Sequence, residues 1–160
     1  MYKKVLVPLD GSEIAECVLP HVAAIAGGCG TESVTFVRVV EPLYMSMTAD
    51  SEQGYTFSAK DWQQMETEQK NAARIYLDRL TSKTKYNGVK IQSEVIYGKA
   101  ADSIADYATR NKFDLITIAT HGRSGVSRWV WGSVADKILR SACVPVLMIR
   151  PPGCGPSIAP

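Results

Sequence analysis

The sequence is poor in residues that bind metal ions. Its four cysteines, Cys17, Cys29, Cys143 and Cys154, show no C-x-x-C spacing, and only two histidines accompany them. Zinc sites are built from such ligands at short, recognisable spacings, and this chain contains no such set. Scattered cysteines of this kind are typical of reduced thiols, and we expect a cytoplasmic location.

The chain also lacks a long apolar run and a large excess of charge. No stretch approaches the roughly 20 apolar residues that span a bilayer, and the N-terminus runs directly into Lys3-Lys4-Val5-Leu6-Val7. Lys and Arg (18) nearly balance Asp and Glu (16), which leaves a net charge of +2 and no indication of a strongly basic surface. We therefore expect a soluble protein that binds neither membranes nor nucleic acid.

The size of the chain favours one domain. At 160 residues and 46% hydrophobic, it can bury one core and is too short for two ordinary domains. We expect a single domain over residues 1–150. The remainder, 151–160, is rich in proline and glycine and is expected to be disordered.

Short apolar runs alternate with helical patterns along the chain. Several runs are apolar on consecutive residues, which indicates strands covered on both faces, as in a parallel sheet. The alternation predicts an α/β fold with a doubly wound parallel sheet. The expected strands are Lys4 to Leu9, Val34 to Val40, Val89 to Tyr97, Asp114 to Ile118 and Val144 to Ile149. The expected helices are Ser12 to Ala26 with a kink at Pro20, a helix from Ser58 with an apolar stripe (Trp62, Met65, Ala72, Ala73, Tyr76, Leu77, Leu80), Ala101 to Arg110, and one that starts at Ser133.

Two loops lie at the carboxyl ends of expected strands, where doubly wound sheets bind their ligands. One is Pro8-Leu9-Asp10-Gly11-Ser12, and the other runs from Ala119 to Ser133 with several glycines. The second loop leads into a helix N-terminus, where unpaired N–H groups and the helix dipole suit a phosphate. The segment from Pro42 to Phe57 is long and polar enough to be functional or disordered.

Positive charge gathers around the second loop. From Ala119 to Arg150 there are five Lys or Arg residues and one acid, a net charge of +4 in a chain whose total is +2. An anionic small molecule is therefore the first partner to consider. Arg123 and Arg128 lie in the loop itself, where they could meet a phosphate or be solvated.

Ser133 and Asp10 each have a second, purely structural interpretation. Ser133 fits the N-cap of the last helix, and Asp10 before Gly11 fits a turn.

Other nucleotide-binding and catalytic motifs fit the sequence less well. The phosphate loop G-x-x-x-x-G-K-[ST] is absent, and Gly28-Cys29-Gly30 follows a helix rather than the strand that a dinucleotide-binding motif requires. No acid is placed to orient His121, so no catalytic residue is predicted.

Three stretches together resemble the universal stress protein family. They are Val5-Leu6-Val7-Pro8-Leu9-Asp10-Gly11-Ser12, then Arg38-Val39-Val40-Glu41, and finally Thr120-His121-Gly122-Arg123-Ser124-Gly125 followed by Gly132-Ser133 and Val144-Pro145-Val146-Leu147. The similarity covers nearly the whole chain. The ATP-binding branch of the family carries glycine, two residues, glycine, nine residues, glycine, then Ser or Thr. Here Gly122, Gly132 and Ser133 match, and Ala119 stands at the first glycine.

The resemblance implies a fold, a ligand and a partner. The fold is a three-layer αβα, Rossmann-like arrangement of five parallel strands in the order 3-2-1-4-5. The ligand is an adenine nucleotide, ATP with Mg²⁺, bound as a regulatory ligand in a stress response. The partner is a second copy of the chain, joined through the last strand, Val144 to Arg150. Two alternatives stay open: a dimeric interaction protein of the same fold that binds no nucleotide, and a slow ATPase.

The resemblance also assigns nucleotide-binding residues. Asp10 would lie near the adenosine and could neighbour the Mg²⁺, and the backbone of Val39 would bind the adenine. The full implied set is Pro8, Asp10, Val39, Ile118, Ala119, Gly122, Arg123, Gly132, Ser133 and Val134, of which Pro8 and Ile118 line the pocket, Arg123 could meet the triphosphate, and Gly122, Gly132, Ser133 and Val134 hold ribose and phosphates.

Overall fold

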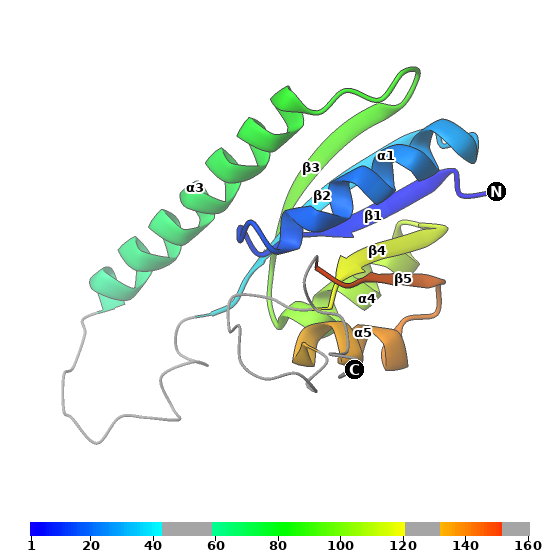
Figure 1. Ribbon diagram of the computed structural model, residues 1–160. Coiled ribbons are helices and arrows are strands. Elements are labelled where there is room, and N and C mark those ends of the chain that lie inside the picture. Colours follow the sequence, from blue (N-terminus) through cyan, green and yellow to red (C-terminus); the bar gives the residue numbers. More distant parts are fainter. Residues whose placement is uncertain (43–58, 121–131, 152–160) are drawn as a thin grey trace, which may run out of the picture.

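A computed structural model describes residues 1–42, 59–120 and 132–151 of the chain (Figure 1). All neighbouring strands of its five-stranded sheet are parallel, and the order β3-β2-β1-β4-β5 confirms the predicted fold. The strands are β1 (Lys4–Pro8), β2 (Ser33–Val40), β3 (Lys90–Tyr97), β4 (Leu115–Ala119) and β5 (Val146–Ile149). The helices are η1 (Ala15–Val18, a 3-10 helix), α1 (Leu19–Gly28), α3 (Ala59–Lys83), α4 (Ala100–Arg110) and α5 (Ser133–Ser141).

Helices cover both faces of the sheet, as Figure 1 shows. The face under η1, α1 and α3 and the face under α4 and α5 each hold one apolar cluster, because the central strands send alternate side chains to opposite faces. The first cluster contains Val5, Val7, Leu9, Ala15, Val18, Val22, Phe36, Tyr76, Leu77, Leu80, Ala119 and Ile149. The second contains Leu6, Val37, Ala101, Ile104, Ala108, Phe113, Ile116, Ile118, Ala135 and Ile138.

One helix start and one N-cap differ from the sequence-based prediction, whereas the last helix begins at Ser133 as predicted. The chain after Ser12 forms the 3-10 helix η1 before α1 begins, and Pro20 lies in the first turn of α1, where its missing N–H costs no intrahelical bond. The last helix has Gly132 rather than Ser133 as its N-cap. Gly132 lies outside the helical region (φ −48°, ψ 128°), and its carbonyl already accepts the N–H of Asp136 at 2.9 Å.

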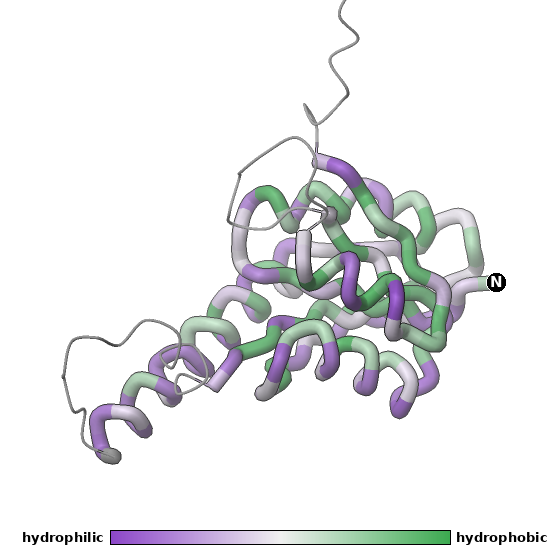
Figure 2. The backbone as a smooth tube through the Cα atoms, turned by 90° about the horizontal axis from the view of Figure 1, so that it is seen from below, coloured by the Kyte–Doolittle hydropathy of each residue, from purple (hydrophilic) through white to green (hydrophobic). Residues whose placement is uncertain are grey.

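Helix α3 is docked along only part of its 25 residues. Ala73, Tyr76, Leu77 and Leu80 are buried, whereas Trp62 and Met65 are half-buried and Ala72 is exposed, although the predicted stripe includes all of them. The amino-terminal half of the helix extends beyond the sheet in both views (Figures 1 and 2). The buried apolar contacts of α3 therefore lie in its carboxyl-terminal half, while Glu66 and Lys70 of the other half contact Tyr97 at the end of β3.

Some predictions fall outside the described ranges. These are the Pro42 to Phe57 loop beyond Pro42, the tail beyond Pro151, and the loop residues Gly122, Arg123 and Arg128. Within the described ranges, none of the helices combines the length and apolar character required to traverse a bilayer.

Candidate functional site

The predicted site residues lie at the carboxyl ends of three neighbouring strands. Pro8 ends β1, Val39 is the second-last residue of β2, and Ile118 and Ala119 end β4. Since β1 pairs with β2 on one side and β4 on the other, the strand order reverses at β1. Open α/β sheets bind ligands at such a reversal. We refer to this region, with the turn after β1 and the start of α5, as the carboxyl end of the sheet.

A hydrogen-bonded turn follows β1. The Oδ1 atom of Asp10 accepts the backbone N–H of Ser12 at 2.9 Å and its hydroxyl at 2.6 Å, and the Ser12 Oγ in turn accepts the N–H of Ala15 at 3.1 Å. These bonds connect the end of β1 to the start of η1. Asp10 thus has the turn role that its position before Gly11 suggested, and its carboxylate is held at the carboxyl end of the sheet.

The two ends of the glycine-containing loop meet beside β4. The N–H of Gly132 donates to the carbonyl of Thr120 at 2.6 Å, and the N–H of Thr120 donates to the carbonyl of Ile149 at 2.9 Å. Thr120 and Gly132, the described residues on either side of 121–131, are therefore bonded to each other next to β5. In this contact the Gly132 N–H is bonded to the chain itself, so the first-turn N–H groups that follow it are the donors to consider for a phosphate.

Helix α5 begins at the same point. The N–H groups of Ser133, Val134 and Ala135 belong to the first turn, which has no intrahelical acceptors for them, and the positive end of the helix dipole lies there. Ser133 and Val134 are exposed, whereas Ala135 is buried in the second cluster. The start of α5 therefore offers exposed backbone donors to an anion at the carboxyl end of the sheet.

Ala119 is buried rather than placed on the surface. Only 8% of the residue is exposed, and it belongs to the first apolar cluster together with Leu9, Ala15 and Ile149. The other β4 residue of the predicted set, Ile118, is 6% exposed and belongs to the second cluster. The methyl group of Ala119 thus contributes to the core beneath the carboxyl end.

An arginine and a tyrosine that the sequence analysis did not single out lie under the turn after β1. The Tyr76 hydroxyl of α3 donates to Glu16 Oε1 at 3.0 Å, and the Arg38 guanidinium of β2 stacks on the Tyr76 ring, with Cζ 5.3 Å from the ring centroid. Arg38 interrupts the apolar run of β2, which was the available signal in the sequence. These residues tie β2 and α3 to the connection between β1 and α1.

Alkaline pH should destabilise the protein through Tyr76. Burial first, and then the hydrogen bond to Glu16, raise the pKa of the Tyr76 phenol well above its ordinary value of 10.0. Because the folded chain holds this proton more tightly, the stabilisation is complete below pH 10 and is lost as the pH rises above 10. We expect Tyr76→Phe to reduce the slope of unfolding free energy above pH 10, by up to about 1.4 kcal/mol per pH unit. Burial also raises the pKa values of Tyr86 and Tyr107, so a smaller slope should remain; an unchanged slope in urea titrations would contradict the assignment.

Glu41 provides a second link at this end of the sheet. Its Oε1 atom accepts the N–H of Ala100, the first residue of α4, at 2.8 Å, and the N–H of Gly98 donates to the carbonyl of Val40 at 3.1 Å. A carboxylate at a helix N-terminus is favoured by the helix dipole. The acid at the end of β2 therefore fixes the start of α4.

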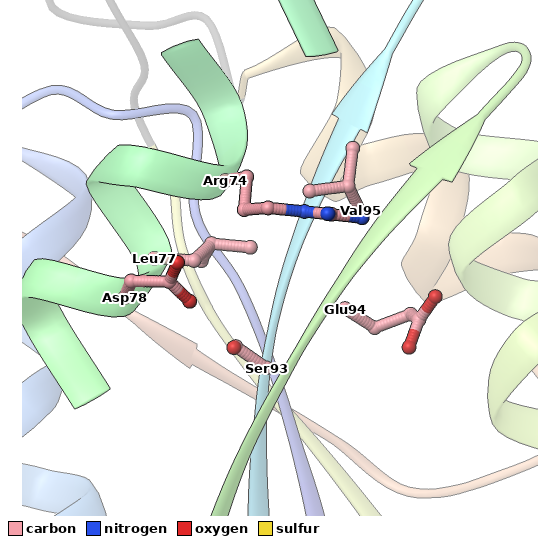
Figure 3. Close-up of a pocket in the computed structure, with 6 residues that line it drawn as sticks. All are labelled: Arg74, Leu77, Asp78, Ser93, Glu94 and Val95. Atoms are coloured by element: carbon pink, nitrogen blue, oxygen red, sulfur yellow. The ribbon is translucent and has the colours of Figure 1, made fainter. Parts of the chain in front are cut away.

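Two hollows lie away from the predicted site, in the groove between α3 and β3. Their volumes are about 260 and 280 Å³, and both are lined by Arg74 and Val95. Figure 3 shows Arg74 reaching from α3 towards Val95, while Glu94 points from β3 away from α3. Neither hollow includes a residue of the predicted nucleotide set. In the parts of the chain that the structure describes, no three His, Cys, Asp or Glu residues gather as a metal site.

These features define a doubly wound α/β protein with backbone donors and one turn carboxylate at the carboxyl end of its sheet. The model of the universal stress protein family matches residues 1–150, and the chain belongs to this family. Among curated relatives, universal stress protein MJ0531 of Methanocaldococcus jannaschii is 28% identical over 152 residues, which are 95% of this chain and 84% of the relative.

Solved structures share the fold. The structure of hypothetical protein MJ0577 from Methanocaldococcus jannaschii has a TM-score of 0.78 at 23% identity and covers 94% of this chain and 96% of its own. A universal stress protein solved in complex with cAMP has a TM-score of 0.57 at 18% identity, and the match covers 94% of this chain and 98% of that protein. A family protein from Arabidopsis thaliana with AMP bound has a TM-score of 0.60 at 18% identity, covering 94% and 93%.

Proposed function

We propose that this protein binds an adenine nucleotide, ATP with Mg²⁺, as a regulatory ligand in a stress response. The observation that carries the proposal is the convergence of β1, β2 and β4 with the start of α5 at the reversal of strand order. Family membership and the relatives solved with AMP and cAMP support the choice of an adenine nucleotide. The free thiols of Cys17, Cys29 and Cys143 suit a cytoplasmic location.

Each part of the nucleotide has a proposed partner. The Val39 backbone takes the adenine, and Pro8 and Ile118 line its pocket. The N–H groups of Ser133 and Val134 take phosphate oxygens at the α5 terminus. The loop residues Gly122 and Arg123 complete the phosphate site in this proposal.

Asp10 is the proposed carboxylate near the metal. Mg²⁺ commonly keeps several waters and takes only one or two carboxylates beside substrate phosphates, so a single acid suits it. The Oδ1 atom of Asp10 already accepts two hydrogen bonds from Ser12, which hold the carboxylate in place. When bound, the ion would neutralise phosphate charge. We assign the protein a binding role and no catalytic residues.

The test is a titration of the wild-type chain and Ala119→Gly with ATP and Mg²⁺. Because the Ala119 methyl is buried in the first cluster, Ala119→Gly should leave the affinity unchanged or tighten it by at most about tenfold, which is about 1.4 kcal/mol. The same change should cost roughly 0.5 to 1 kcal/mol of stability. No binding by either protein at millimolar ATP, and no nucleotide in the supernatant of denatured purified protein, would favour the interaction protein instead.

We further propose a homodimer formed through β5. This strand lies at the edge of the sheet, with Leu147 37% exposed and Val146 and Met148 half-buried. Uncovered apolar edge strands are normally paired or protected. Leu147→Asp should convert a dimer to a monomer near 17.5 kDa in sedimentation velocity, whereas Ile75→Asp on α3 should leave the mass unchanged. A monomeric wild-type chain at micromolar concentration would contradict the proposal.

A further inference from the structure

One arginine lies between α3 and the turn after β1. The Arg38 guanidinium stacks on the Tyr76 ring, and a methyl group placed on Gly11 would lie 2.8 Å from its Nη1, 3.0 Å from its Cζ and 3.2 Å from its Nη2. All three nearest atoms thus belong to the guanidinium group, which occupies the space that a side chain on Gly11 would take. Gly11 has a φ of +84°, which glycine adopts without strain.

The hydrogen bonds that link Asp10, Ser12 and Ala15 are local. Asp10, Ser12 and Ala15 are linked to one another over a few residues, and none of these bonds reaches α3. The bond from the Tyr76 hydroxyl to Glu16 reaches η1, beyond the turn. The Arg38 guanidinium thus connects Tyr76, in the docked part of α3, with Gly11, the residue next to Asp10.

Arginine is well suited to this place. Its guanidinium is planar and weakly hydrated for a cation, so it can stack on an aromatic ring with one face and pack on backbone with the other. A second arginine gives an internal comparison. Arg79, on α3 itself, lies 6.0 Å from the same Tyr76 ring but is not among the atoms nearest to Gly11.

We propose that Arg38 is a positioning residue for the ligand site. By filling the space between the Tyr76 ring and Gly11, it holds the Asp10 turn in the conformation that binds the nucleotide, and it makes nucleotide affinity depend on the docking of α3. The ligand in this inference rests on the proposed function. The contact between Arg38 and Gly11 does not.

The first arm of the test measures ATP affinity in the presence of Mg²⁺ by calorimetry, at a temperature where circular dichroism shows every variant folded. Arg38→Met should raise the Kd for ATP roughly tenfold. Arg79→Met is the matched control. It removes a guanidinium next to the Tyr76 ring but none near Gly11, so its Kd for ATP should stay within about twofold of the wild-type value. Equal affinities of Arg38→Met and wild type would overturn the inference.

The second arm needs no nucleotide. In a double-mutant cycle, Gly11→Ala is introduced into the wild-type chain and into Arg38→Ala, and the unfolding equilibrium constant is measured in urea. The left-handed strain of Gly11→Ala is common to both backgrounds, but the clash with the guanidinium is present only in the first. Because the guanidinium is the far end of a flexible side chain, the destabilisation by Gly11→Ala should be smaller in the Arg38→Ala background by roughly twofold in the unfolding equilibrium constant. Identical effects would overturn the contact and the inference.

The two arms separate the possible failures. If the wild-type chain binds no adenine nucleotide, the proposed function fails and the positioning role fails with it. If the wild-type chain binds ATP and either arm gives the overturning result, only the role of Arg38 is lost.

Discussion

Replacing Leu77 with alanine should lower the free energy of unfolding by about 3 kcal/mol, within the usual range for a buried leucine. Leu77 is 1% exposed and lies in the docked half of α3, among the few buried residues that hold this helix on the sheet. The loss of its side chain leaves a cavity under α3 that the neighbouring strands cannot fill completely. Urea denaturation followed by circular dichroism measures the change.

Ile75 provides the control for this prediction. It lies on the same helix and is 69% exposed, so Ile75→Ala should change the free energy of unfolding by less than about 0.5 kcal/mol. Similar losses in the two variants would mean that α3 is not docked through the face that contains Leu77.

Gly132→Val is expected to weaken ATP binding at least about 100-fold, or 2.7 kcal/mol, while the fold survives. The φ of Gly132 is negative (φ −48°, ψ 128°), so the change does not place valine in the left-handed region. Its side chain, however, would stand where the loop closes on Thr120 and α5 begins, in the proposed path of the phosphates. Calorimetric titration with ATP and Mg²⁺ measures the effect.

Gly27→Val supplies a matched glycine at a distance from the site. Gly27 lies near the end of α1, and a side chain there would meet no atom within 4 Å. This variant should bind ATP like the wild type. If Gly132→Val is folded and also keeps its affinity, the start of α5 is not the phosphate site.

The fold could be predicted because the central strands are apolar on both faces. The runs at β1 and β4 are buried along almost their whole length, and a sequence with five such runs separated by helical patterns has few other arrangements. The start of α5 at Ser133 was predicted correctly, but the second interpretation of Ser133 as the N-cap was wrong, although Ser133 is a good capping residue by propensity. The contact between Gly132 and Thr120 decides the position, and contacts between distant residues are not visible in local sequence.

The candidate site was predictable only in part. Asp10, Val39 and Ala119 could be placed at one end of the sheet because parallel strands share their direction. The contact of Arg38 with Gly11 could not be predicted, since it depends on how β2, α3 and the turn after β1 meet in space. The burial of Ala119 in the core likewise depends on the packing of β4 against η1 and α1.

The hydrogen bond between Gly132 and Thr120 joins the start of α5 to the end of β4, on either side of residues 121–131. Because strand and helix are fastened to each other at the base of this loop, its length and composition can change without moving either element. The entropic cost of lengthening a flexible loop is small, about 0.6 kcal/mol for each doubling. We therefore expect that replacing residues 121–131 with the corresponding segment of a relative leaves the five strands as they are.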